Sequence, residues 1–369
     1  MRKGWEYKKL GEVCDITMGQ SPNGNSINEA NGVEFHQGKT CFGERFLGVS
    51  PLYSNAPTKL AEAHSVLLCV RAPVGYPNIT DRKICIGRGL CALYAKGEID
   101  NTFLYYSLLG KQSYFEKNAT GSTFKAISSK IVSNTTLSIP PLSTQLAIVS
   151  ELDKINELIR LKKEQLKDFD NLAQSLFYEM FGDPVENEKG WEVKKIKDIA
   201  KYYNGVAHEQ DVDKDGNFVL INAKFISSEG QIKKYTSIQR FPLLKNDIVM
   251  VLSDLPNGKS LAKCFLIDED NKYTLNQRIC CFRGFEGSSV YLKNIINRNP
   301  YLLSFDNGKG QTNLRKGDVE KISIPLPPLS LQRLFAQRIE QIEREKSEVQ
   351  KSIQDLETLL ASRMQYWFE

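Results

Sequence analysis

The chain has 369 residues, of which 41% are hydrophobic and 25% charged, and its formal net charge is +5 with a pI near 8.6. This length allows two domains of ordinary size, and the composition is that of a folded protein rather than a disordered one. No window approaches about eighteen consecutive apolar residues, and the N-terminus lacks the apolar core of a signal peptide. These features argue against membrane and secreted proteins, so the expected location is the cytoplasm. The mildly basic charge is compatible with nucleic-acid binding but does not require it.

The eight cysteines form no recognisable metal-binding or disulfide pattern. No pair has the spacing Cys-x-x-Cys, the chain has only three histidines, and several cysteines lie in apolar runs such as residues 66–70. A buried cysteine behaves as a small hydrophobic residue. The sequence therefore predicts free, buried thiols and no bound metal.

The first 140 residues combine strand-like apolar runs with polar, glycine-rich loops. Residues 65–71 are predicted to form a buried strand that delivers Arg71 at its end, and residues 83–94 a second strand that carries Arg88 between two glycines. Residues 101–115 are predicted to form a short helix. This part of the chain therefore indicates a module of mixed strands and short helices.

A long amphipathic helix is predicted to follow the first module. It begins at Pro140-Pro141 with Ser143 as the expected N-cap, and Gly182 ends it. At about 1.5 Å per residue the helix is roughly 55 Å long, which is typical of a coiled coil. Apolar residues recur mostly in steps of three and four and form one stripe, which comprises Leu146, Val149, Leu152, Ile155, Ile159, Leu166, Phe169, Leu172, Leu176 and Met180.

The second half of the chain repeats this plan. Gly190-Trp191-Glu192 restates Gly4-Trp5-Glu6, and Arg278 is aligned with Arg88. The sequence therefore predicts a tandem duplication with four parts, namely residues 1–140, 141–182, 183–326 and 327–369. The second helix has its own apolar stripe, which comprises Leu334, Ile339, Ile342, Val349, Ile353, Leu356, Leu360, Met364 and Trp367.

One departure from the repeat lies just before the long helices. Residues 314–318 read Leu-Arg-Lys-Gly-Asp, and residues 127–131 lack this motif. We therefore expect the two joins between module and helix to differ in geometry.

Together these motifs resemble the specificity (S) subunits of type I restriction–modification systems, the HsdS family, over essentially the whole chain. The resemblance is carried by Gly19-Gln-Ser-Pro, Val70-Arg-Ala-Pro-Val-Gly75 and Ile86-Gly-Arg-Gly89, and by Pro-Pro-Leu-Ser-x-x-Gln at the start of both long helices. It implies an α/β (α+β) fold in which two target-recognition domains are separated by two long antiparallel coiled-coil helices, as a pseudo-twofold tandem repeat. It also implies that each domain reads one half of a bipartite target in double-stranded DNA, and that the helices set the spacer.

The same resemblance implies partners and cofactors outside this chain. Two methyltransferase (M) subunits are expected to dock on the helices and to bring S-adenosylmethionine. Restriction (R) subunits, with ATP and Mg²⁺, are expected to join through the complex. No cofactor is expected in the chain itself.

Candidate DNA-contacting residues are polar side chains next to glycines or at predicted strand ends. Arginine suits guanine, and asparagine or glutamine suits adenine, in the major groove. Arg88 and Arg278 have an alternative role, because equivalent strand positions also suit residues that hold the scaffold. The candidates are Gln37, Lys39, Arg45, Arg71 and Arg88 in the first module and Lys224, Asn257, Lys259, Gln277 and Arg278 in the second.

No motif of a catalytic site is present in the sequence. There is no phosphate-binding loop, and Ile139-Pro-Pro-Leu142 does not match the Asn/Asp-Pro-Pro-aromatic motif of an amino-methyltransferase. Asp254, Asp268, Glu269 and Asp270 are expected to be solvated loop acids. The chain is therefore predicted to be non-catalytic, and the alternative to DNA recognition is a coiled-coil scaffold whose modules bind protein partners.

Overall fold

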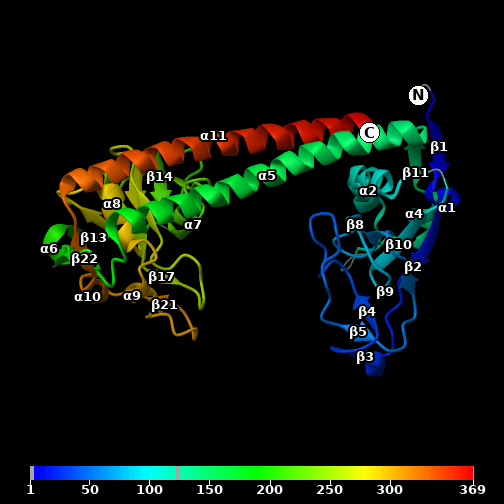
Figure 1. Ribbon diagram of the computed structural model, residues 1–369, viewed down its shortest axis with the longest axis horizontal. Helices are drawn as coiled ribbons and strands as arrows, with labels where there is room; N and C mark the ends of the chain where they lie inside the picture. The colour runs from blue at the N-terminus through cyan, green and yellow to red at the C-terminus, as the bar shows by residue number, and fades with distance from the viewer. Residues whose placement is uncertain (1–3, 98, 122–124, 209, 369) are drawn as a thin grey trace. The chain divides into compact units, whose positions relative to one another are not determined.

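The computed structural model describes residues 4–97, 99–121, 125–208 and 210–368. It divides into two compact units, one made of Met1–Glu164 and Gln350–Glu369 and the other of Gln165–Val349. Each unit contains one module and parts of both long helices, α5 (Leu142–Phe181) and α11 (Leu329–Phe368) (Figure 1). Among the residues that the structure describes, no helix combines the length and apolarity needed to cross a membrane.

Module 1 is built on two larger sheets with short helices beside them. A four-stranded antiparallel sheet has the order β2-β10-β7-β8, and a five-stranded sheet has the order β3-β5-β4-β9-β6. The strands are β2 (Cys14–Met18), β3 (Ile27–Asn28), β4 (Val33–His36), β5 (Tyr53–Ser54), β6 (Leu60–Ala61), β7 (Val66–Cys69), β8 (Pro77–Ile79), β9 (Ile84–Ile86) and β10 (Leu90–Ala95). The helices are α1 (Leu10–Val13), α2 (Asn101–Gly110) and α3 (Gln112–Asn118).

Module 2 repeats the four-stranded sheet with the order β13-β20-β16-β18 and adds a three-stranded sheet with the order β15-β14-β19. The strands are β13 (Lys201–Asn204), β14 (Phe218–Ile221), β15 (Tyr235–Thr236), β16 (Ile248–Val251), β17 (Ser253–Asp254), β18 (Cys264–Leu266), β19 (Tyr273–Leu275), β20 (Ile279–Arg283) and β21 (Thr312–Asn313). The helices are α6 (Ile196–Ile199), α7 (Ala223–Ser227), α8 (Ser289–Ile296) and α9 (Pro300–Leu303).

The strand predicted over residues 83–94 is two strands, and the corresponding stretch of module 2 is divided in the same way. Residues 83–94 form β9 and β10, which belong to different sheets, and residues 87–89 are the turn between them. Residues 273–283 likewise form β19 and β20. Arg88 and Arg278 therefore lie in turns rather than inside strands. The sequence did not reveal these turns because the residues on both sides of each turn form apolar strands.

Both modules join their long helix in the same way. Strand β1 (Glu6–Lys9) pairs with β11 (Thr136–Ile139), and β12 (Glu192–Lys195) pairs with β22 (Ser323–Leu326) in the corresponding antiparallel register. A short helix precedes the second strand of each pair: α4 (Ser129–Asn134) comes before β11, and α10 (Lys316–Val319) comes before β22. The two joins therefore share their strand pairing, contrary to the expectation that they differ in geometry. They differ in the cap of the short helix, because the Ser128 hydroxyl accepts the Ile131 N–H at α4, whereas the Asp318 carboxylate accepts the Arg315 N–H at α10.

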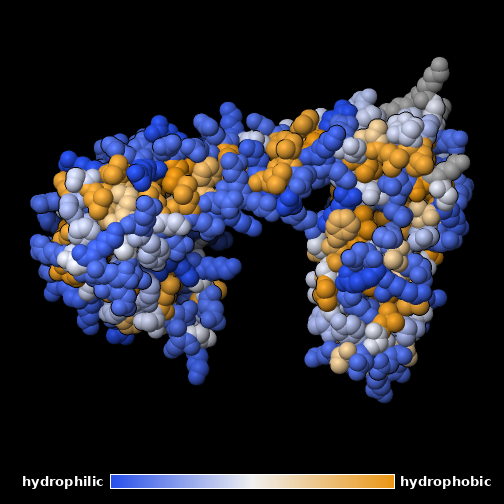
Figure 2. All heavy atoms as spheres, viewed as in Figure 1, coloured by the Kyte–Doolittle hydropathy of each residue, from blue (hydrophilic) through white to orange (hydrophobic). Residues whose placement is uncertain are grey.

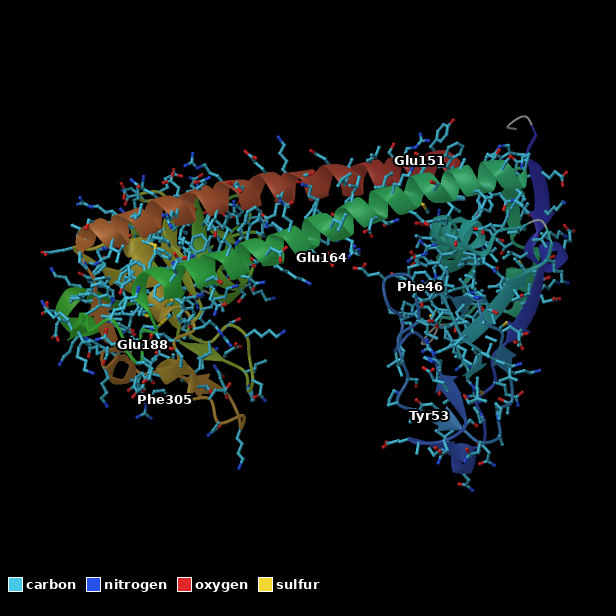
Figure 3. All side chains as sticks on the ribbon, in the orientation of Figure 1. Phe46, Tyr53, Glu151, Glu164, Glu188 and Phe305 are labelled. Atoms are coloured by element: carbon cyan, nitrogen blue, oxygen red, sulfur yellow. The ribbon has the colours of Figure 1, made fainter. Side chains whose placement is uncertain are left out.

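Within each unit the two long helices run antiparallel. Glu151 of α5 pairs with Arg363 of α11 in the first unit, where Figure 3 shows Glu151 beside α11, and Asp170 lies 2.8 Å from the Lys346 ammonium in the second. Ser143 is not the N-cap, because α5 has already begun at Leu142. Three residues of the predicted stripes are 42–52% exposed rather than buried, namely Leu146, Leu172 and Leu334.

The last residue of each long helix packs on a short helix of a module. Phe181, near the end of α5, lies with its ring centroid 4.7 Å from that of Tyr291 in α8. Phe368, near the end of α11, lies 5.6 Å from Phe103 in α2. Each long helix therefore ends in the aromatic core of a module, and the duplicated architecture of mixed modules and long antiparallel helices is confirmed.

The cysteines behave as small core residues. All eight lie in the described part of the chain and are free, seven of them buried and Cys41 half-buried. Burial raises the pKa of the Cys69 thiol to about 12, so this thiol stays protonated near neutral pH.

Candidate nucleic-acid interface

The carboxyl ends of three strands in module 1 open onto a hollow of about 490 Å³. Parallel neighbours β4 and β9 end there at His36 and Ile86, and β7 leads there through Val70. Four of the five candidates in this module line this hollow, which we call hollow 1, namely Gln37, Lys39, Arg71 and Arg88. The side chains of all four are exposed.

Hollow 1 is electropositive. Its described lining residues include no carboxylate, and no described residue pairs with the guanidinium groups of Arg71 or Arg88. The ammonium of Lys39 lies 4.3 Å from the ring centroid of Tyr76, a cation–π contact that holds this side chain over the surface. Three cations with free hydrogen-bond donors suit phosphate oxygens and the acceptor edges of bases.

A half-buried carboxylate, that of Glu34, holds two of the residues that line hollow 1. Glu34 accepts hydrogen bonds from the Ser50 backbone N–H at 2.7 Å and from Nε of Arg82 at 2.6 Å, and it lies 2.8 Å from the His36 ring. Burial alone would raise the pKa of Glu34, but these hydrogen bonds outweigh burial and lower it to about 2. Burial also lowers the pKa of His36. The ion pair therefore fixes two lining residues, His36 and Ser50, in place.

Module 2 has a hollow of about 420 Å³ at the equivalent place, hollow 2. The backbone bonds establish the equivalence: Gly87 N–H donates to His36 at 2.7 Å, and Asn276 N–H donates to Ile221 at 3.2 Å. The bonds from Val70 to Gly89 and from Leu252 to Arg278 are both 2.9 Å long. Hollow 2 is lined by Asn222, Ala223, Ser253, Asp254, Leu255, Asn276, Gln277, Arg278, Ile279 and Gln311.

This register corrects one alignment made from the sequence. Arg88 corresponds to Gln277, and Arg278 corresponds to Gly89, so the alignment of Arg278 with Arg88 is wrong by one residue. Both Gly89 and Arg278 have positive φ, at 100° and 66°. The two turns share a backbone shape, but the modules place their arginine at different positions in it.

The register also shows which positions sequence reasoning missed. Asn222 stands where module 1 has Gln37, and Ser253 stands where it has Arg71. Gln311 lines hollow 2 as well, from the loop that precedes β21. Asn222 and Ser253 could have been found by aligning the two modules strand by strand, whereas Gln311 carries no such signal.

The remaining candidates lie outside the two lining sets. Lys224 is exposed on α7 and corresponds in register to Lys39. Asn257 and Lys259 are exposed in the loop after β17. The Asp254 carboxylate holds this loop by accepting the Ser260 and Leu261 N–H groups, so Asp254 is a loop-forming residue rather than a solvated acid.

Arg45 is a bracing residue. Its guanidinium donates to Asp153 of α5 at 2.7 Å and to the Thr102 hydroxyl at 3.1 Å, and it lies over three aromatic rings. Figure 3 shows the neighbouring Phe46 nearer to α5 than Tyr53, which marks the remote end of module 1. Arg45 therefore ties the module to its helix and does not line hollow 1.

Among the described residues, no group of three or more His, Cys, Asp or Glu side chains is placed to hold a metal ion. The chemistry of both hollows is that of hydrogen-bond donors and acceptors, with excess positive charge in hollow 1.

Comparison with known proteins agrees with this architecture. The chain is 38% identical over 176 residues to a protein of Methanocaldococcus jannaschii provisionally named the MjaX specificity subunit of a type I restriction enzyme, covering 47% of this chain and 41% of that one. It is 26% identical over 230 residues to the type I restriction enzyme MjaIX specificity subunit of the same organism, covering 55% and 53%. The chain thus spans about half the length of these relatives.

Solved structures share the fold over the whole chain. The S subunit of a type I restriction–modification system from M. genitalium has a TM-score of 0.56 at 15% identity, covering 99% of this chain and 96% of that one. A chain solved in a study of complex assembly and conformational transition of the type I R-M system has a TM-score of 0.66 at 17% identity, covering 100% and 98%.

A sequence model described as the type I restriction modification DNA specificity domain matches residues 2–168 and again residues 188–358. Each match contains one module and most of the long helix that follows it. The chain therefore belongs to the family of type I restriction–modification DNA specificity proteins and carries two copies of their domain.

Proposed function

We propose that this chain is the DNA sequence-recognition subunit of a type I restriction–modification complex. Module 1 reads one half of a bipartite double-stranded target through hollow 1, and module 2 reads the other half through hollow 2. The observation that carries this proposal is the equivalence of the two hollows, which lie at matching strand ends but carry different side chains. A shared scaffold with different reading residues is what two half-sites of different sequence require.

The exposed donors suit base recognition in the major groove. Two guanidinium groups, from Arg71 and Arg88, can each form a bidentate pair with O6 and N7 of guanine, and the amide of Gln37 suits adenine. Figure 2 shows hydrophilic residues over the loop end of module 2, in the region of β17 and β21. Lysines such as Lys224 and Lys259 would contact phosphates, which position the protein without specifying bases.

The long helices are the proposed docking surface for two M subunits. They expose leucines at repeated places, Leu142 and Leu329 near their starts and Leu172 and Leu359 further along. Repeated exposed leucines favour two equivalent partner sites. One solved structure of this fold comes from a study of complex assembly of the type I R-M system.

The chemistry of the complex would lie in its partners. M subunits would bring S-adenosylmethionine, and R subunits would join through the complex with ATP and Mg²⁺. This chain would act without catalysis, in the cytoplasm where the DNA target is.

The test uses the chain assembled with its M subunits and maps methylated bases on genomic DNA. Wild-type complex is expected to methylate one bipartite motif, and Arg71→Ala with Arg88→Ala is expected to abolish or relax the motif in one half only. Lys83→Ala is the matched control, because Lys83 is an exposed cation at the other end of β9, paired with Glu62. Methylation without a bipartite motif would refute the proposal.

A further inference from the structure

We propose that Arg278 reads a guanine in the second half-site from a backbone conformation that costs fold stability. This inference rests on the proposed function and deepens it. It assigns the guanidinium of hollow 2 to the position that is Gly89 in module 1, rather than to the position of Arg88.

The backbone of Arg278 is held in the left-handed region. Its φ is 66°, and its carbonyl accepts a hydrogen bond from Leu252 N–H at 2.9 Å. The same bond from Val70 to Gly89 holds the equivalent glycine at φ 100°. Glycine adopts this region without steric cost, whereas arginine is strained there by its Cβ. Glycine would therefore suit the fold better at position 278.

The side chain of Arg278 makes no polar contact with the described residues that would offset this strain. It is exposed, and no described residue forms an ion pair or hydrogen bond with its guanidinium. Arg298 is a useful contrast, because it also has positive φ, at 52°, but its guanidinium lies 3.4 Å from the Gly258 and Leu261 carbonyls and braces their loop. Strain that no internal contact offsets is typical of a functional position.

The surroundings of Arg278 indicate base recognition rather than general attraction to DNA. Four side-chain amides line the same hollow, from Asn222, Asn276, Gln277 and Gln311. Amides and a guanidinium together match the donors and acceptors on base edges, and arginine pairs best with guanine. A hollow built only for phosphate would be lined mainly by cations, as hollow 1 partly is.

The experiment compares Arg278→Gly with wild type in the full chain assembled with its M subunits. Thermal unfolding is expected to be unchanged or shifted upward, because glycine fits the turn. Affinity for the cognate duplex is expected to fall roughly 10- to 100-fold, with one guanine position relaxed in the second half of the methylation motif. Affinity for unrelated duplex at the same salt should stay within about twofold.

Two matched variants separate the causes. Asn271→Gly changes another exposed residue with positive φ, 57°, outside hollow 2, and Lys272→Ala removes a nearby surface cation paired with Glu269. Both should keep the wild-type motif.

Other results of the Arg278→Gly experiment would lead to different conclusions. A lower melting temperature for Arg278→Gly would assign Arg278 to the scaffold, and an equal loss of affinity for all sequences would assign it to a phosphate. An unchanged motif would overturn the inference alone, whereas a wild-type complex without any bipartite motif would overturn the proposed function itself.

Discussion

The side-chain oxygen of Gln145 in α5 accepts a hydrogen bond from the backbone N–H of Asp100, 3.0 Å away, where Asp100 caps α2. The amide nitrogen of the same side chain donates to the Pro140 carbonyl at 2.9 Å. Gln332 repeats both bonds in module 2, with Ser288 and Pro327 as its partners. The glutamine of Pro-Pro-Leu-Ser-x-x-Gln therefore fastens the start of each long helix to a short helix of the module.

Replacing this glutamine should cost stability in one module at a time. Gln145 is only 1% exposed, so Gln145→Leu leaves the Asp100 N–H and the Pro140 carbonyl buried without these partners. The expected loss in free energy of unfolding is about 1–3 kcal/mol for each unsatisfied group. Denaturant unfolding of the full chain measures it, and Gln332→Leu should affect the other module alone. Identical unfolding curves for wild type and variant would show that these two hydrogen bonds do not contribute to stability.

The sequence predicted elements better than it predicted contacts. Pro140-Pro141 and Gly182 gave the limits of α5 closely because proline and glycine act locally on the backbone. The partner of Arg45 could not be predicted, since Asp153 lies far along the chain on another element. The turn that carries Arg278 was misaligned because an arginine stands where the first module has glycine, so no local signal marks the positive φ.

The residues that line the two hollows also divide into those predicted from the sequence and those that were missed. Gln37, Lys39, Arg71 and Arg88 were identified as polar residues beside glycines or at strand ends, and they converge because β4 and β9 end together with β7. Asn222 and Ser253 were missed because their role depends on register between strands that are distant in sequence.

The hydrogen-bonded Glu34 carboxylate predicts acid sensitivity of module 1. Glu34 has a pKa lowered to about 2, so its charged form stabilises the fold above its unfolded value of 4.5, and this contribution is lost as pH falls from 4.5 to about 2. His36, whose pKa is also lowered, adds a loss that begins as pH falls below 6.5. Stability of module 1 is therefore expected to decrease with acidification across this whole window.

Glu34→Gln tests this origin of the acid sensitivity. At pH 7 the variant loses its ion pair with Arg82, and the free energy of unfolding should fall by about 1–3 kcal/mol. The difference from wild type should shrink below pH 4.5, because the wild-type carboxylate is then progressively neutralised. Unfolding curves across this pH range provide the measurement. A constant difference at every pH would show that Glu34 is not the titrating group.

Exchange of a whole module should change one half of the target. Residues 1–140 from another family member are expected to alter a single half of the methylation motif, because hollow 1 lies wholly within them. The exchange must respect Asp153, which accepts hydrogen bonds from Arg45 and from the Tyr106 hydroxyl at 2.7 and 2.6 Å. A donor module lacking both partners should be destabilised by about 1–3 kcal/mol. Changes in both halves of the motif would show that the modules do not read independently.

The length of the long helices should set the spacer between the half-sites. Each helix has 40 residues, or about 60 Å at 1.5 Å per residue, which is longer than one turn of DNA. The two compact units divide between Glu164 and Gln165 in α5 and between Val349 and Gln350 in α11. An insertion at both points lengthens the two helices equally.

Four residues inserted at both points should lengthen the spacer by one or two base pairs. Four residues add about 6 Å and leave the apolar stripes on both sides of the insertion nearly on the same helix face. A coiled coil tolerates such an insertion by local unwinding. Base pairs in B-DNA are about 3.4 Å apart, so both half-sites should stay unchanged while their separation grows. Two inserted residues turn the apolar stripe by about 200° and should abolish folding or methylation. Motif mapping of both variants decides the matter once circular dichroism has shown that the helices persist. A four-residue variant that folds, methylates and keeps the original spacer would show that the helices do not measure the gap.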